Sequence, residues 1–332
     1  SFIIYHFSFF ILTFSFLDLF WFGFNYNPIG KVKDWHAFPP TAEFLKEDTS
    51  DYRIFSPLSS FVWNKIFENR GWQGDASEYL TFKNMVAPDM NLLWNIPTIE
   101  FYSGIAPERI IYLQSLLVDT FQVLDHAGQK ELLIADSTLR MLNLLSVKYI
   151  VTPGIINHPD FELVFRTNLP QKPNYNIYQN LTVWPQARVV YGYEQASSIE
   201  DAGVKLLDPN FDPTKKVILE QDIDLRVQQV ACDSRVEITK NENNLVELGV
   251  RMKDNGILVL GDTFYPGWKA LVNGQEKEII PANINQRAVI LPKGEYKVEF
   301  NYNPASFKAG LALTAFSWLG FLGGFVYEKR TD

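Results

Sequence analysis

One segment of the sequence combines flat aromatic rings with carboxylate, amide and guanidinium groups. It covers residues 261–270 and continues in residues 282–288. Carbohydrate-binding sites use these residue types, because sugars stack their C–H faces on Trp or Tyr while Asp, Asn and Arg bind the hydroxyl groups. The candidate ligand contacts in this segment are Asp262, Tyr265, Asn283 and Arg287.

The same segment also has a purely structural interpretation. Pro266 and Gly267 favour a turn, after which Trp268 enters a strand. Side chains alternate along a strand, so Trp268 shares its face with the apolar Ala270 and Val272. This pattern favours Trp268 as an apolar plug at the end of a β-sandwich, and it leaves Tyr265 as the ring at the tip.

The signatures of common enzyme classes are missing from the sequence. It contains no Walker A motif, no dinucleotide-binding glycine motif, no G-x-S-x-G and no H-E-x-x-H. The histidines lie far apart, and none has a second ligand at metal-site spacing: they are His6, His36, His126 and His158. The sequence therefore predicts no metal site and no cofactor.

Both ends of the chain are apolar enough to lie in a bilayer. Residues 1–24 contain one carboxylate, Asp18, and no Lys or Arg, and they lack the basic start and cleavage site of a secretory signal. Residues 309–327 are 19 residues without a charge. Since a membrane span needs about 20 mainly apolar residues, we predict a truncated transmembrane helix over 1–24 and a C-terminal one, with a short cytoplasmic tail, over 307–332.

Charge indicates the orientation and the partners. Lys329 and Arg330 favour a cytoplasmic tail by the positive-inside tendency. The predicted localisation is thus the bacterial cytoplasmic membrane, multi-pass, with the large domain extracytoplasmic. A single cysteine, Cys232, excludes an intrachain disulfide, and this favours a bacterial envelope over eukaryotic secretion. The formal net charge of −8 disfavours nucleic acid as a partner.

The sequence pattern of the region between the apolar ends changes near Pro185. Residues 25–185 are predicted to form a mixed α/β subdomain, with helices at 41–47, 107–124 and 135–145 and strands at 52–56 and 147–151. Residues 186–306 are predicted to form a β-sandwich, with strands at 188–193, 217–219, 235–239, 245–252, 256–260, 268–272, 287–291 and 296–302, a hairpin at Asn273-Gly274 and one helix at 198–207. The predicted fold class is an α+β outward domain flanked by two transmembrane helices.

The aromatic segment also carries a family resemblance. In order and spacing, the chain resembles the C-terminal region of YfhO-family bacterial membrane proteins over DTFYPGWKA (262–270), VNG (272–274), AN (282–283), RAV (287–289) and LPKG (291–294). Upstream, NLLSVKYIV (143–151), NLL (91–93) and PER (107–109) look like other segments of that family, so the resemblance covers nearly the whole chain. Two departures are Asn273, where Asp is frequent, and Phe264, where a second Tyr is usual.

The resemblance implies a function. YfhO-like proteins are multi-span, GT-C-like glycosyltransferases that would move a sugar from a polyprenyl-phosphate carrier onto an envelope glycopolymer such as teichoic acid. The GT-C catalytic carboxylate is expected upstream of this sequence, so no residue here inherits that role. The implied role is acceptor binding or support, and the alternative is a non-enzymatic carbohydrate-binding or assembly module of the bacterial envelope.

Overall fold

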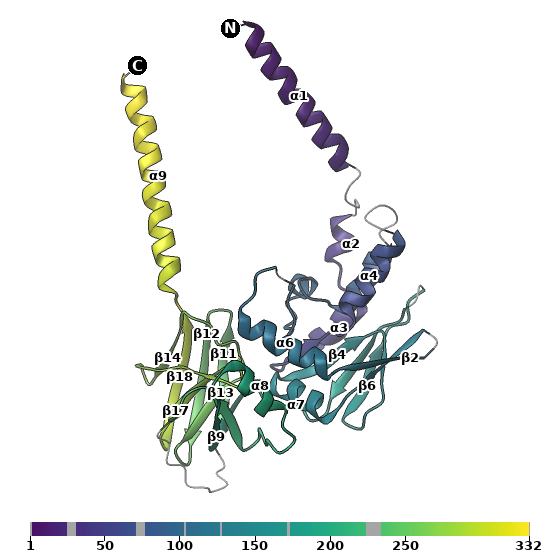
Figure 1. The fold of residues 1–332 in the computed structure, drawn as a ribbon, viewed down its shortest axis with the longest axis vertical. Coiled ribbons are helices and arrows are strands. Elements are labelled where there is room, and N and C mark those ends of the chain that lie inside the picture. The colour runs from purple at the N-terminus through teal and green to yellow at the C-terminus, as the bar shows by residue number, and fades with distance from the viewer. Residues whose placement is uncertain are drawn as a thin grey trace. The chain divides into compact units, whose positions relative to one another are not determined.

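The computed structural model describes residues 2–24, 31–70, 77–102, 104–126, 128–170, 173–223 and 234–331; Cys232 lies outside them. The chain divides into two compact units (Figure 1). The first comprises Ser1–Gly104 and Phe121–Trp184, and the second comprises Ile105–Thr120 and Pro185–Asp332. The sequence pattern places a boundary near residue 185, but it does not anticipate that residues 105–120 join the second unit.

Each unit carries one long apolar helix at its chain end. Helix α1 spans Phe2–Phe24, and helix α9 spans Ala305–Thr331. The segments His6–Gly23 and Ala305–Leu322 are long and apolar enough to cross a membrane, and no part of either segment is buried by the rest of the chain. The two apolar terminal helices expected from the sequence are therefore present.

The first unit is built around a four-stranded sheet with the order β1-β4-β7-β6. β1 is parallel to β4, and the other neighbours are antiparallel. The central strand β4 is buried at every position except Lys148, and its apolar residues pack against helix α3. The strands are β1 Arg53–Phe55, β4 Val147–Thr152, β6 Phe161–Arg166 and β7 Asn176–Asn180.

Helices and a small sheet complete the first unit. The helices are α2 Val32–His36, α3 Pro40–Glu47, α4 Ser59–Arg70, α5 Ser77–Phe82, α7 Asp136–Leu144 and the 3₁₀-helices η1 Lys83–Met85 and η2 Met90–Trp94. The small sheet has the order β2-β3-β5, with β2 Gln122–His126, β3 Gln129–Leu133 and β5 Ile155–Ile156. The helices predicted at 41–47 and 135–145 are confirmed to within one residue at each end.

The helix predicted over residues 107–124 ends earlier than expected. Helix α6 spans Glu108–Thr120, and the chain then enters the β2–β3 hairpin. The Asp125 carboxylate holds this hairpin, because it accepts a hydrogen bond from the Gly128 N–H at 2.8 Å and pairs with Lys130 at 2.6 Å. The predicted C-terminal boundary is wrong because these contacts favour strand pairing over further helical turns.

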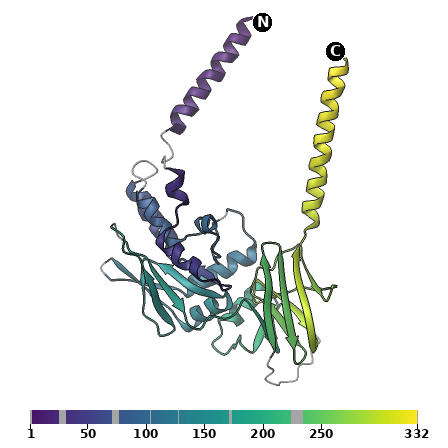
Figure 2. The ribbon, with the colours of Figure 1, turned by 180° about the vertical axis from the view of Figure 1, so that it is seen from behind.

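The strands of the second unit are drawn mainly in green and yellow in Figure 2. Six of them form a sheet with the order β8-β13-β17-β16-β10-β9. β8 and β9 lie at opposite edges of this sheet, although only Tyr191 separates them in the chain. Consecutive Cα atoms are about 3.8 Å apart, so the sheet curls until its two edges meet at Tyr191. The single strand predicted at 188–193 is therefore two strands. The bounds are β8 Ala187–Val190, β9 Gly192–Gln195, β10 Lys216–Leu219, β13 Gly256–Leu260, β16 Ile280–Ala282 and β17 Gln286–Leu291.

The two faces of this curled sheet carry different cores. One face carries a sheet core made by its own strands and by Ile223, which follows β10: Val190, Val217, Leu219, Ile223, Ile257, Val259, Ile280, Ala282 and Ala288. The other face contributes to a shared core with a second sheet. The shared core consists of Ala187, Val246, Leu248, Val250, Met252, Leu258, Leu260, Ala270, Val272, Val289, Leu291, Val298 and Phe300.

The second sheet is antiparallel and has the order β11-β12-β18-β14-β15. Its strands are β11 Arg235–Glu242, β12 Leu245–Met252, β14 Trp268–Val272, β15 Gln275–Lys277 and β18 Gly294–Tyr302. The predicted hairpin is confirmed, because Val272 pairs with Gln275 and the turn residues Asn273 and Gly274 have φ of 50° and 81°. Both values suit the type I′ turn that this residue pair favours.

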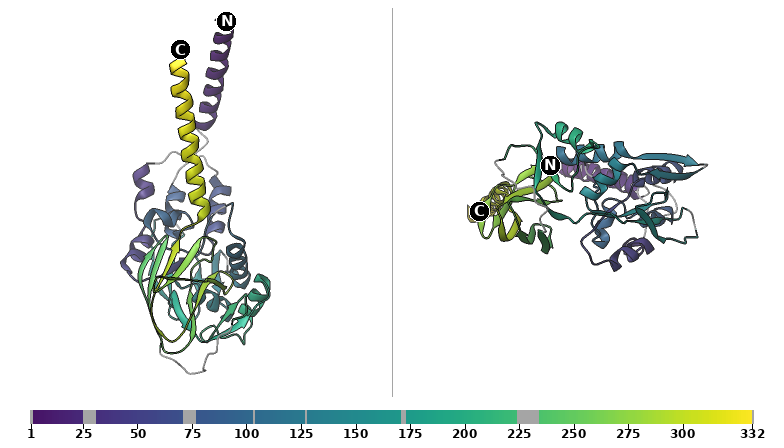
Figure 3. Two further views of the ribbon diagram at one scale, coloured as in Figure 1. Left: turned by 90° about the vertical axis from the view of Figure 1, so that its left-hand side faces the viewer. Right: turned by 90° about the horizontal axis from the view of Figure 1, so that it is seen from below.

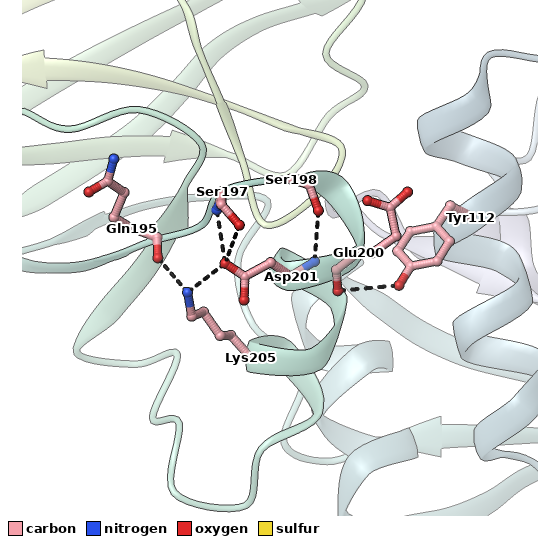
Figure 4. A network of polar contacts seen from close by, with 7 residues as sticks. All are labelled: Tyr112, Gln195, Ser197, Ser198, Glu200, Asp201 and Lys205. Carbon is pink, nitrogen blue, oxygen red and sulfur yellow. Dashed lines mark hydrogen bonds and ion pairs between the residues drawn. The ribbon is translucent and has the colours of Figure 1, made fainter.

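Helix α6 packs in the second unit against helix α8, Ile199–Leu207. Ser198 caps α8 by accepting a hydrogen bond from the Asp201 N–H at 3.2 Å, and Lys205 bridges the Asp201 carboxylate and the Gln195 carbonyl (Figure 4). A Cβ atom at Gly203 would collide with the Tyr112 ring of α6. The close approach of α6 to α8 therefore requires glycine at this position.

A partly buried carboxylate fixes the end of α3 to the central strand of the first unit. Asp48 accepts hydrogen bonds from Lys148 Nζ at 2.5 Å, from Tyr149 Oη at 2.8 Å and from the Ser50 N–H at 2.9 Å. Burial by itself would raise the pKa of the Asp48 carboxyl, but these donors outweigh burial and hold the pKa well below its usual range.

We expect Asp48→Asn to lower the free energy of unfolding by about 2 kcal/mol at pH 7, the range for hydrogen bonds to a charged group. A carboxyl whose pKa is depressed in the folded state stabilises the fold fully at pH values above its unfolded-state pKa of about 3.9. This stabilisation is lost as the pH falls below that value. Thermal unfolding of the detergent-solubilised chain should show a large difference from wild type at pH 7 and a smaller one at pH 3. The exposed neighbour Glu47, replaced by Gln, is the control, and an equal deficit at both pH values would contradict the assignment.

Candidate functional site

The aromatic segment forms a turn that connects one sheet of the second unit with the other. It leaves β13 at Leu260 and enters β14 at Trp268. Backbone hydrogen bonds fix it at two points: the Gly261 N–H donates to the Gln186 carbonyl at 2.6 Å, and the Phe264 N–H donates to the Asn285 carbonyl at 2.8 Å. The turn is therefore hydrogen-bonded to the residue before β8 and to the residue before β17.

Arg287 is the charged centre of this region. Its side chain lies on the shared-core face of β17 and is 0 % exposed. The guanidinium is paired with the Asp262 carboxylate, and its central carbon lies 3.8 Å from the ring centroid of Trp268 and 5.3 Å from that of Phe300. A buried charge is tolerated only when it is paired, so Asp262 and the aromatic rings are what allow Arg287 to lie in the core.

Three aromatic rings extend from Arg287 to the surface. Trp268 lies 5.3 Å from Tyr302, and Tyr265 lies 6.4 Å from Tyr302, measured between ring centroids. We call Arg287, Trp268, Tyr302 and Tyr265 the aromatic–arginine row. Trp268 is partly buried against the shared core and lies on the same face as the buried Ala270 and Val272, as the alternation predicts. Tyr265, 44 % exposed, forms the outer end of the row.

Asn283 lies on the other side of the curled sheet. Its Oδ1 accepts a hydrogen bond from the Ile218 N–H at 3.0 Å, and its Nδ2 donates to Gln286 Oε1 at 2.9 Å. Gln286 also accepts a hydrogen bond from Arg188 at 3.5 Å. Because Gln286 and Arg287 are successive strand residues, their side chains point to opposite faces, so Asn283 belongs with the sheet core and away from the aromatic–arginine row.

A second arginine, which the sequence pattern did not single out as a site residue, ties helix α6 to the same loops. Arg109 forms a two-pronged ion pair with Glu220, donates to the Ile284 carbonyl at 2.7 Å and lies 5.4 Å from the Phe264 ring centroid. Ile284 has a φ of +74° in a tight turn closed by the Asn285 N–H and the Asn283 carbonyl at 2.9 Å. A β-branched residue in this conformation is strained, and Arg109 holds the carbonyl of the strained residue.

The four sequence-predicted ligand residues thus do not form one open site. The structure brings Asp262 and Arg287 together, separates them from Asn283 by the sheet, and leaves Asp262 and Tyr265 with accessible surface. Asn283, 2 % exposed, and Arg287 are enclosed by protein. Within the described part of the chain, no group of three or more His, Cys, Asp or Glu is arranged to hold a metal ion. Ligand contact by these four residues stays a prediction, and among them Asp262 and Tyr265 have accessible surface.

A comparison of the chain with protein-family models, curated proteins and solved structures found no match.

We expect Asp262→Ala to lower the free energy of unfolding by about 3 kcal/mol, because it leaves the buried Arg287 charge uncompensated. The double replacement Asp262→Ala with Arg287→Met should be less destabilising than the single one, since it removes the charge that needs a partner. Chemical denaturation of the detergent-solubilised chain measures both. The exposed pair Arg251–Glu295 is the control, where Glu295→Ala should change stability by under about 1 kcal/mol. A double variant less stable than Asp262→Ala would refute this account.

We expect Trp268→Ala to be destabilising by about 3 kcal/mol, at the lower end of the range for a large aromatic because the ring is only partly buried. Replacement of its exposed neighbour, Lys269→Ala, should cost under about 1 kcal/mol, since it removes only a surface ion pair with Glu276. An unchanged denaturation midpoint for Trp268→Ala would rule out the structural role of this ring.

Proposed function

We propose that this chain is the membrane-anchored C-terminal region of a YfhO-like glycosyltransferase of the bacterial cytoplasmic membrane. In this proposal α1 and α9 cross the bilayer, residues 25–306 lie outside the cytoplasm, and the region supports the catalytic part or binds the acceptor polymer. We also propose that the two sheets around the shared core pack as a β-sandwich. The shared core supports this packing, because both sheets supply its residues.

The apolar terminal helices carry the proposal. Helix α1 exposes a dozen large apolar side chains between Phe7 and Phe22. Leaving these in water would cost on the order of 20 kcal/mol at about 1.5–3 kcal/mol per side chain, which exceeds the total stability of a typical domain, roughly 5–15 kcal/mol. In α9 the 19 uncharged residues 309–327 extend over about 28 Å as a helix, close to the 30 Å of the hydrocarbon layer. Insertion into a bilayer would bury the apolar side chains of both helices.

The enclosure of two candidate ligand residues supports the non-catalytic role. Arg287 and Asn283 are used inside the protein, and each has a structural partner. We infer that the transfer chemistry, with a polyprenyl-phosphate sugar as donor and an envelope glycopolymer as acceptor, takes place on the catalytic part of the whole protein. Residues 1–332 alone are then expected to turn over no polyprenyl-phosphate sugar.

A second candidate function is a non-enzymatic carbohydrate-binding or assembly module of the envelope. The accessible Tyr265 ring, in the same turn as the partly accessible Asp262 carboxylate, favours this candidate. The gene upstream of Ser1 distinguishes the two functions. Further apolar spans with an acidic residue in the first outward loop would favour the enzyme, and a start codon directly before Ser1 would favour the module.

The topology is testable by cysteine labelling in intact cells. With Cys232 replaced by Ser, a cysteine at Lys215, whose side chain is 78 % exposed, should react with a membrane-impermeant maleimide. A cysteine at Thr331 should react only after lysis, because the basic tail is placed in the cytoplasm. The opposite labelling pattern would overturn the proposed orientation, and labelling of both positions in intact cells would show that α9 does not cross the membrane.

A further inference from the structure

We propose that the aromatic turn is an interfacial anchor, and that Tyr265 lies in the headgroup layer of the bilayer that holds α9. This inference rests on the proposed insertion of α9, and it assigns the turn a lipid partner in place of a sugar. Tyr and Trp are enriched at membrane–water interfaces because their rings are apolar and their O–H or N–H groups remain hydrated.

The turn is attached to the residues that lead into α9. Strand β18 ends at Tyr302, and only Asn303 and Pro304 separate it from Ala305, where the helix begins (Figure 3). The Asn303 N–H donates to the Gly267 carbonyl at 2.9 Å. Gly267 has a φ of +108°, and a Cβ atom there would come within 2.9 Å of Pro304 and 3.0 Å of Tyr302. The turn therefore lies directly against the start of the helix.

The helical rise gives the depth of the turn. The uncharged run of α9 begins at Ala309, so Pro304 lies five residues outside it, or about 7.5 Å at 1.5 Å per residue. The headgroup layer on each side of the hydrocarbon core is roughly 5–8 Å thick. Pro304, and the turn that contacts it, are consequently at headgroup depth, with Lys308 between them and the hydrocarbon.

The arrangement of the rings favours lipid over sugar. A sugar-stacking platform needs an open aromatic face, but Trp268 is covered by the Arg287 guanidinium at 3.8 Å and packs beside Tyr302. Tyr265 is exposed at the end of the row, two residues before Gly267. Tyr265 is an exposed tyrosine close to the start of the proposed membrane helix, and its ring packs against that of Tyr302. These are the features of an interfacial anchor.

Site-directed spin labelling of the whole chain in nanodiscs tests this inference. In the Cys232→Ser background, one nitroxide replaces Tyr265, a second replaces Lys293 and a third replaces Thr314. Lys293 directly precedes β18 and is nine residues before Tyr302, about 30 Å away at 3.3 Å per residue, and it is exposed. The spin relaxation of each nitroxide is measured with three paramagnetic reagents. Nickel-chelating lipids place the ion at the headgroups, a water-soluble nickel chelate stays in the aqueous phase, and oxygen concentrates in the hydrocarbon.

We expect nickel lipids to relax the label at 265 severalfold more than the label at 293, and oxygen to relax the label at 314 most. A label at 265 that responds like the label at 293, while 314 responds to oxygen, would overturn the anchor and leave the membrane insertion of α9 intact. A label at 314 that responds mainly to the water-soluble chelate would instead refute the insertion, and the proposed function with it. Thermal unfolding of each labelled chain checks that its fold is retained.

Discussion

The burial of a single guanidinium organises the second unit. Arg287 has no exposed surface, so its charge must be balanced inside the protein. Asp262, two residues after the end of β13, pairs with the guanidinium. Trp268, the first residue of β14, covers it. Because β13 belongs to the curled sheet and β14 to the second sheet, this cluster sets the point at which the chain passes from one sheet to the other.

Two loops and two arginines are interlocked around that point. The turn at 261–267 and the tight turn at 283–285 are joined by the hydrogen bond from the Phe264 N–H to the Asn285 carbonyl. Arg287 holds the first loop through Asp262, and Arg109 holds the second through the Ile284 carbonyl while lying over the Phe264 ring. Helix α6, which carries Arg109, is thereby fastened to the strands of the second unit although it precedes them by some distance in the chain.

The first unit also contains a buried cation. Lys83 is 4 % exposed, and its ammonium group donates to the carbonyls of Asp34 at 2.5 Å and Ala37 at 2.7 Å, at the end of α2. Burial lowers the pKa of Lys83. Through its two hydrogen bonds Lys83, the first residue of η1, fastens η1 to α2 within the first unit.

Local patterns in the sequence determined the apolar terminal helices, helices α3, α7 and α8, and the hairpin at Asn273-Gly274. These features depend on composition, on period and on residues that are close in the chain. The alternation of β14 likewise predicted the face that Trp268 shares with Ala270 and Val272. Only the tertiary structure decided the rest. The division of one predicted strand at Tyr191 follows from sheet curling, and α6 joins the second unit through Arg109 and Glu220, which are 111 residues apart. The enclosure of Asn283 and Arg287 on opposite faces of one sheet depends on pairing between distant strands. A sequence shows which side chains can bind a ligand, but whether they reach solvent depends on long-range packing that no local pattern encodes.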